Sequence, residues 1–335
     1  MDFIELIRSI YGGRRFFVKD MGVESEMHAQ HFGISQGCPL TPFLFIIVMT
    51  ILMHDAKIAL QQLYPNVEAD PYTVHELLYA DDTLLIGTES NQIQSYMNVV
   101  VDLGATYGLQ LNWKKVELLA ARCSPIINDK EGLALESKTS IGYLGALLDA
   151  SGKIQSELHR RIGMASADFK VLSRIWNHSD LSRTSKVRIY MSCIVSKLLY
   201  GLQSAWLTKV QRAKLDGFHA RCIRKIAGIK HAYWSRVSNF DVLASMHSYP
   251  LSRLLLEQQL IYFGKVWRRP HDDIIRRLIF VAGTDELVIS SSKRKRGRPR
   301  LSWAIEIQKH VRQIQGDMSD ATHWKQLVRS YCRGG

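Results

Sequence analysis

Two adjacent aspartates, Asp81 and Asp82, stand inside the apolar stretch LLYADDTLLIG, residues 77–87. Neighbouring carboxylates repel each other unless a cation holds them together. Aspartate oxygens suit Mg²⁺, which keeps several waters and shares itself with substrate phosphates, and two such ions can clamp both oxygens of a nucleotidyl transfer. The pair therefore indicates a divalent-cation site, although two solvated acids in a turn are the commoner explanation of such a pair taken alone.

The apolar residues around the pair predict the elements that position it. They indicate a strand, a tight turn and a second strand over residues 72–87, with the flanking leucines anchored in a core. The apolar run 43–53 is too short to span a bilayer and is typical of a buried helix. The other predicted elements are a helix over 40–63, an amphipathic helix over 88–110, strands over 114–121 and 139–150, and long helices from residue 155 onward. This order predicts an α+β fold, in which antiparallel strands with packed helices precede an all-α region.

Charge divides the chain at about the same point. Residues 1–150 hold 10 Lys and Arg against 18 Asp and Glu, and the totals of 44 and 31 leave 34 and 13 for residues 151–335. The two balances are therefore −8 and +21. A basic half of this size most simply indicates a polyanion partner, because each neutralised phosphate releases counterions; a soluble protein with a basic surface is the alternative.

Composition excludes other classes of protein. With 335 residues and 46% hydrophobic content the chain is long enough for two or three domains around real cores. Its five cysteines form no CxxC pair, which argues against a zinc site or a disulfide framework. The amino terminus lacks the pattern of a signal peptide. We therefore expect an intracellular protein, in the nucleus or the cytoplasm, without a membrane partner.

Four motifs in order carry a resemblance to a known family. Tyr79-Ala80-Asp81-Asp82 follows GISQGCPLTPFLF (33–45) and precedes GLQLNWKKVE (108–117) and YLGALLD (143–149). The set resembles reverse transcriptases of the non-long-terminal-repeat retrotransposon type, with the order and spacing of that family's palm domain. The resemblance covers residues 1 to about 165 densely and the basic helical remainder more loosely.

The resemblance implies catalytic roles for three residues. Asp81 would be the principal ligand of Mg²⁺, or of Mn²⁺ in its place, and Asp82 the weaker second ligand. Lys115 matches the lysine of the family's N-x-x-K-[ST]-E pattern and would neutralise the departing pyrophosphate. Val116 stands where that pattern has a hydroxyl residue, and a solvated lysine is the alternative for Lys115.

The resemblance and the basic pattern also imply contacts with nucleic acid. The loop residues 33–37 would lie under the incoming nucleotide and template, and the hairpin at 143–145 would grip the primer; a helix cap and an ordinary core hairpin are the alternatives. The KRKRGRPR stretch fits an AT-hook core, a nuclear localisation segment or solvated charge equally. The residues predicted to contact substrate or nucleic acid are Gly33, Ser35, Gln36, Gly37, Tyr79, Tyr143, Leu144, Gly145, Arg160, Arg161, Arg296 and Arg298.

One family motif has no counterpart in the chain. The family uses a further aspartate in an F-x-x-D-x-x-x-A-[FY]-D context upstream of Gln36, and neither Asp2 nor Asp20 has that context. We therefore expect an amino-terminally truncated reverse transcriptase: a partial palm with the primer-grip hairpin over 1–150, a basic helical thumb or connection domain over 151–290, and a basic linker with terminal helices over 291–335.

These patterns predict an RNA-directed DNA polymerase that uses two Mg²⁺ ions and is inactive as this isolated chain. Its partners would be an RNA template, a DNA primer and dNTPs, with target DNA as a further one. The alternative function is a non-catalytic nucleic-acid-binding remnant that uses the basic half. The sequence predicts no oligomeric state.

Overall fold

The computed structural model describes residues 2–31, 33–34, 37–63, 76–178, 180–288 and 302–334. The chain is α+β, as predicted: helices alternate with small two-stranded sheets. Its described residues form two compact units, one with the residues up to Leu111 and one with the residues from Asn112 onward together with the segment 87–90.

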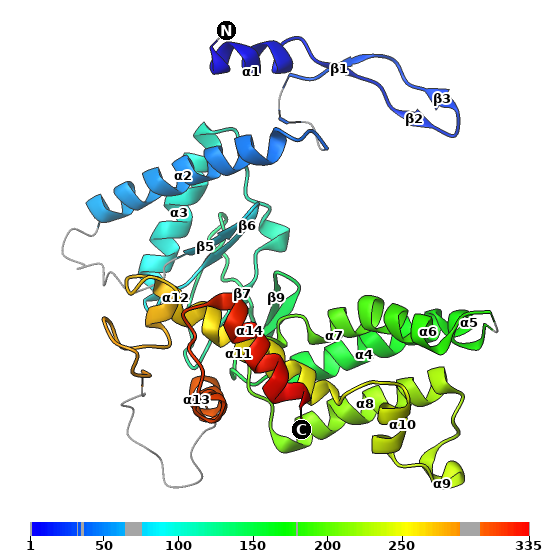
Figure 1. Ribbon diagram of the computed structural model, residues 1–335. Coiled ribbons are helices and arrows are strands. Elements are labelled where there is room, and N and C mark those ends of the chain that lie inside the picture. The colour runs from blue at the N-terminus through cyan, green and yellow to red at the C-terminus, as the bar shows by residue number, and fades with distance from the viewer. Residues whose placement is uncertain are drawn as a thin grey trace. The chain divides into compact units, whose positions relative to one another are not determined.

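The first unit carries the acidic motif on a hairpin (Figure 1). Its elements are α1 (Phe3–Tyr11), β1 (Arg15–Phe16), β2 (Lys19–Asp20), β3 (Val23–Glu24), β4 (His28–Ala29), α2 (Thr41–Leu63), β5 (Glu76–Tyr79), β6 (Asp82–Leu85) and α3 (Ser90–Thr106). The strands pair antiparallel as β1 with β4, β2 with β3, and β5 with β6. The predicted hairpin and the two predicted helices around it are therefore confirmed.

The core of the first unit is small. Met53 and Ala56 of α2 and Tyr96 of α3 form its buried cluster, with Leu85 of β6 packed against them, and Leu52 and Met97 of the same helices are buried as well. The first half of α2, as far as Met53, is apolar on all sides, so covering one face leaves the other in solvent, and Phe43 is 67% exposed. The prediction that the run 43–53 is buried is therefore wrong for most of its side chains. By length and composition alone α2 would suffice to cross a membrane, and 17% of its most apolar window is buried.

The second unit begins with short strands. Its first elements are a 3₁₀ turn η1 (Trp113–Lys115), β7 (Leu118–Leu119), β8 (Ser137–Lys138), β9 (Ser140–Tyr143) and β10 (Ala146–Asp149). β7 pairs parallel with β8, and β9 pairs antiparallel with β10. The strand predicted over 114–121 is shorter than expected, because the backbone N–H of Lys115 bonds to the Asn112 carbonyl and closes a helical turn there.

Long helices build the rest of this unit (Figure 1). They are α4 (Gln155–Val171), α5 (Ser173–Asn177), α6 (Arg183–Tyr190), a π turn η2 (Met191–Val195), α7 (Ser196–Leu199), the 3₁₀ turn η3 (Leu202–Ser204), α8 (Lys209–Ala227), α9 (Ala232–Ser235), α10 (Asn239–Ser245), α11 (Leu251–Trp267) and α12 (Ile274–Arg277). Leu158, Tyr190, Leu198, Leu215 and Ile223 belong to one large buried cluster that joins these helices. This core is far more extensive than that of the first unit.

Two further helices, α13 (Trp303–Ile314) and α14 (Ala321–Arg333), pack onto α11. Trp324 of α14 is fully buried, donates its indole N–H to the Leu260 carbonyl at 3.0 Å, and leaves no room for a Cβ at Gly264. Packing therefore divides the chain after Leu111 and joins these helices to the preceding ones. The functional division predicted at residues 150 and 290 stays a prediction.

Candidate active site

The acidic pair lies at the tip of the β5–β6 hairpin. Tyr79 pairs with Asp82 across the strands, so Ala80 and Asp81 form a two-residue turn. Ala80 has φ 52°, and a positive φ at the first central residue alone is the pattern of a type II′ turn, where glycine is usual. An alanine held in this left-handed conformation is strained. Asp81 therefore lies in a strained turn, and Asp82 begins the second strand.

The base of the hairpin is fixed to both helices of the unit. The side chain of Glu76, the first residue of β5, is 9% exposed and forms an ion pair with Lys57 of α2. The Tyr96 hydroxyl of α3 donates to the same carboxylate at 3.3 Å. Burial and the Glu76 charge raise the pKa of Tyr96. The Glu76 carboxylate thus joins the base of the hairpin to α2 and α3, and the tip of the hairpin projects away from this base.

The tip itself is open. Asp81 and Asp82 are both exposed, and within the described residues neither carboxylate forms an ion pair. Leu77 and Leu78 are 43% and 41% exposed, so the prediction that the flanking leucines are anchored in a core is wrong for the first strand. No group of three His, Cys, Asp or Glu side chains able to hold a metal ion occurs in the described parts of the chain. Two adjacent hard oxygen donors without a cationic partner fit a divalent cation that takes its other ligands from water or substrate.

Lys115 belongs to the second unit. It ends the 3₁₀ turn η1 and is exposed, while the nearby Glu117 pairs with Lys138 at 2.5 Å. The ammonium group of Lys115 is therefore available for an anion.

The predicted nucleotide-binding loop is described in part. Gly33 and Gly37 have φ 81° and 92°, a conformation that favours glycine over any other residue. Ser35 and Gln36 lie outside the described residues, as do Arg296 and Arg298 of the basic stretch. The left-handed conformation thus explains why glycine stands at both positions, and their place under the incoming nucleotide stays a prediction.

A second hairpin carries the predicted primer grip. Tyr143 pairs with Ala146, and the two residues between them, Leu144 and Gly145, have φ 47° and 74°. Positive φ at both central positions is the pattern of a type I′ turn, which matches the twist of the flanking strands. Leucine in the first of these positions is strained, so other contacts must hold the turn.

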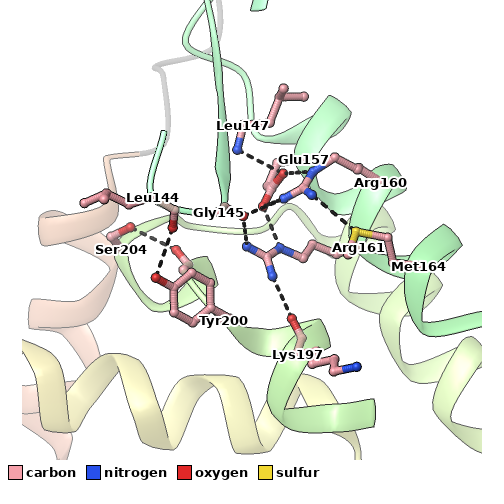
Figure 2. Close-up of polar contacts among 11 residues, drawn as sticks. Leu144, Gly145, Leu147, Glu157, Arg160, Arg161, Met164, Lys197, Tyr200 and Ser204 are labelled. Carbon is pink, nitrogen blue, oxygen red and sulfur yellow. Dashed lines mark hydrogen bonds and ion pairs between the residues drawn. The ribbon is translucent and has the colours of Figure 1, made fainter. Parts of the chain in front are cut away.

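Helix α4 supplies those contacts (Figure 2). Arg160 and Arg161 both donate to the Gly145 carbonyl, at 2.8 and 2.7 Å. Arg161 also donates to the Lys197 carbonyl at 2.8 Å, and its side chain is only 6% exposed. The carbonyl of the preceding residue, Leu144, accepts the Tyr200 hydroxyl at 3.0 Å. Both carbonyls of the turn are therefore held by side chains from outside the hairpin.

Glu157 lies at the centre of this network. Its carboxylate pairs with Arg160 at 2.7 Å and with Arg161 at 2.6 Å, and it accepts the backbone N–H of Leu147 at 3.2 Å. Burial acts to raise the pKa of Glu157, but the hydrogen bonds from the two guanidinium groups outweigh it and lower that pKa. We call Glu157, Arg160, Arg161 and Tyr200 the turn clamp.

The turn clamp changes the interpretation of two predicted residues. The geometry gives Arg161 a structural role, because its charge is neutralised and its nitrogens are occupied; contact of Arg160 or Arg161 with nucleic acid stays a prediction. Sequence reasoning missed Glu157 and Tyr200. The spacing of Glu157 three and four residues before the arginines was the available signal.

Comparison with known proteins assigns the segment that contains both hairpins. Residues 3–148 match the family model described as reverse transcriptase (RNA-dependent DNA polymerase). This segment of the chain is therefore similar to reverse transcriptases. A transposon-derived protein of Caenorhabditis elegans is similar to the chain, 25% identical over 158 residues that make up 46% of this chain and 56% of the relative.

The predicted resemblance to retrotransposon reverse transcriptases is confirmed by these two matches, while the non-long-terminal-repeat subtype and the amino-terminal truncation stay predictions. The chain spans about half the length of the curated relative it matches. Reverse transcriptases generally depend on divalent metal and bind template, primer and dNTPs. The acidic tip lies inside the matched residues, whereas the clamp residues on α4 and beyond follow them.

Proposed function

We propose that the chain is the polymerase part of a non-long-terminal-repeat retrotransposon reverse transcriptase, with Asp81 and Asp82 as the ligands of Mg²⁺ or Mn²⁺. The observation that carries the proposal is the exposed tip of the β5–β6 hairpin, where two adjacent carboxylates lie without a cationic partner among the described residues. The tip falls within the segment that matches the reverse transcriptase family.

Different residues of the chain would have different roles in nucleotidyl transfer. Bound divalent ions would supply Lewis-acid activation of the primer hydroxyl and of the departing pyrophosphate. Lys115 offers an exposed cation for the charge that develops on the leaving group. Tyr79, 64% exposed and paired with Asp82, offers a flat surface beside the tip for the primer end. The clamped turn at Leu144 and Gly145 would hold the primer strand on a rigid support.

We further propose that the chain of 335 residues binds a primer–template without extending it. Two ions need a carboxylate that bridges them in addition to the tip pair, and the described residues bring no third carboxylate to Asp81 and Asp82. Without that ligand, in-line attack is poorly aligned and the chemical step is slow. The missing carboxylate would have to come from outside these residues.

A second candidate function is non-catalytic binding of nucleic acid. The balance of +21 over residues 151–335 favours it, because affinity for a polyanion needs charge and no metal. The two candidates differ in one property: only the polymerase part retains a metal site at the tip.

Electron paramagnetic resonance of bound Mn²⁺ separates the two candidate functions. The measurement is made in the presence of a DNA primer annealed to an RNA template. We expect weak Mn²⁺ binding that Asp81→Asn removes. Asp102→Asn, which neutralises an exposed aspartate on α3 of the same unit, is the matched control and should leave it intact. Equal Mn²⁺ binding by wild type and Asp81→Asn would leave only the non-catalytic function.

A further inference from the structure

The helical unit contains a basic pocket away from both hairpins. Its volume is about 560 Å³, and it is lined by the ends of α5 and α8, the first half of α6 and the segment that follows α8. Its cationic lining residues are Arg183, Lys186, Arg224, Lys225 and Lys230. No Asp or Glu is among the lining residues. We call this cavity the basic pocket.

Two of the five cations are buried. Lys186 is 8% exposed and Arg224 is 5% exposed. The Lys186 ammonium donates to the Trp176 carbonyl at 3.1 Å, and the Arg224 guanidinium donates to the Val237 carbonyl at 2.6 Å and to Asn239 at 2.9 Å. All of these acceptors are neutral. Within the described residues neither cation has a carboxylate partner, although a buried charge is costly unless it is paired.

The other three cations, Arg183, Lys225 and Lys230, are exposed around the pocket. Gly228 ends α8 in the left-handed conformation with φ 73°, which turns the chain so that Lys230 lines the same cavity as Lys225. The concentration of charge therefore follows from the way in which α8 ends.

The helix ends do not balance this charge. The carboxy-terminal ends of α5 and α8 each carry roughly half a negative charge at most, against five cationic side chains. Asp180, the nearest carboxylate along the chain, does not line the pocket. A surplus of positive charge with two buried members calls for an anion from outside the protein.

We propose that the basic pocket binds a backbone phosphate of a nucleic-acid strand, an inference that rests on the proposed function. Phosphate oxygens accept several charge-assisted hydrogen bonds at once. The nitrogens of Arg224 already donate to neutral acceptors, so this residue contributes its charge, while the Arg183 guanidinium and the three lysine ammonium groups provide donors in the pocket and around it. A strand also explains why the cations outnumber the charge of one phosphate, because neighbouring phosphates would meet the exposed Lys225 and Lys230.

The first test removes the exposed cations and leaves the core intact. The double variant Lys225→Gln with Lys230→Gln is compared with Lys170→Gln with Lys209→Gln, which removes two exposed cations elsewhere on the same unit. Fluorescence anisotropy with a single-stranded oligonucleotide measures the binding constant of each variant at several salt concentrations. The pocket variant should bind roughly fivefold to tenfold more weakly and lower the slope of log K against log salt by about one, whereas the control keeps the slope.

The second test changes Lys186, one of the two buried cations. Lys186→Met keeps the length of the side chain and removes its charge, so the free protein should melt at a higher temperature while its oligonucleotide affinity falls. A lower melting temperature with unchanged affinity would show that Lys186 serves only the Trp176 carbonyl, and would overturn the proposal.

Inorganic phosphate separates a strand from a free anion. If phosphate raises the melting temperature of the wild type but the pocket variants bind the oligonucleotide as tightly as their controls, the pocket takes a free anion and the proposal is overturned. If the wild-type chain binds no oligonucleotide at all, the proposed function fails together with the inference. Unaltered binding by the pocket variants overturns the inference alone.

Discussion

The β5–β6 and β9–β10 hairpins end in similar turns and are supported differently. Ala80 at φ 52° and Leu144 at φ 47° are both non-glycine residues in the left-handed region. Arg160, Arg161 and Tyr200 hold both carbonyls of the Leu144 turn. Within the described residues no side-chain hydrogen bond reaches the Ala80–Asp81 turn.

The difference separates what the chain provides from what it requires. The Leu144 turn is held by a carboxylate and two guanidinium groups of the protein itself, so its contacts form without any ligand. The tip of the β5–β6 hairpin presents two carboxylates that have no cationic partner in the part of the chain that the structure describes, which is where a cation and the substrates that share it would bind. Under the proposed function, the turn on the primer side is already held by side chains of this protein, whereas the tip pair needs further ligands for its metal ions.

The largest effect is expected from Glu157→Gln. This change leaves the buried guanidinium of Arg161 without its counter-charge, and breaking a buried pair costs about 3–5 kcal/mol. Asp168→Asn, on the same helix, breaks the exposed pair with Lys197 and should cost less than about 1 kcal/mol. Urea unfolding measures both free energies, and equal losses would contradict a turn clamp centred on Glu157.

Gly145→Ala tests the turn itself. At φ 74° an added Cβ is strained, so we expect a loss of about 1–2 kcal/mol in the free energy of unfolding. Gly142→Ala, in the adjacent strand with open space around its Cβ position, is the control and should be close to neutral. Similar values for the two variants would show that the turn relaxes to accept a Cβ, and would contradict a turn that the clamp holds in place.

Acidification should weaken the clamp. The pKa of Glu157 lies below its ordinary value of 4.5, so its contribution to stability is complete above that pH and is lost as pH falls through the lowered pKa. Wild type should therefore lose more stability than Glu157→Gln between pH 5 and pH 3. Parallel losses in the two proteins would argue against a charged Glu157 in the folded state.

The smallest effect is expected from Tyr200→Phe. It removes one hydrogen bond to the Leu144 carbonyl and keeps the ring beside Arg161, so the cost should be about 0.5–1 kcal/mol. Tyr233→Phe, whose ring is also exposed, provides the control. A loss as large as that of Glu157→Gln would place the centre of the clamp at Tyr200 instead.

Sequence alone located both hairpins, because strand alternation and two-residue turns are local patterns. It did not show that Glu157 and Arg161 are buried. A Glu and an Arg four residues apart look the same in the sequence whether that face of the helix lies in solvent or packs against the turn of a hairpin. It also missed the packing of Trp324 on Gly264, which joins residues 60 apart. Helix α2 looked like a core helix because hydropathy reports what a side chain prefers, while burial depends on which elements are present to cover it.

Primer extension on an RNA template, with Mg²⁺ and dNTPs, tests the central claim most directly. The proposed metal site, with no third carboxylate beside the tip pair among the described residues, predicts that the purified chain binds the primer–template in a salt-dependent way and adds no nucleotide. Extension by the wild-type chain that Asp81→Asn abolishes would contradict this account, because it would show that these residues already hold a complete catalytic site.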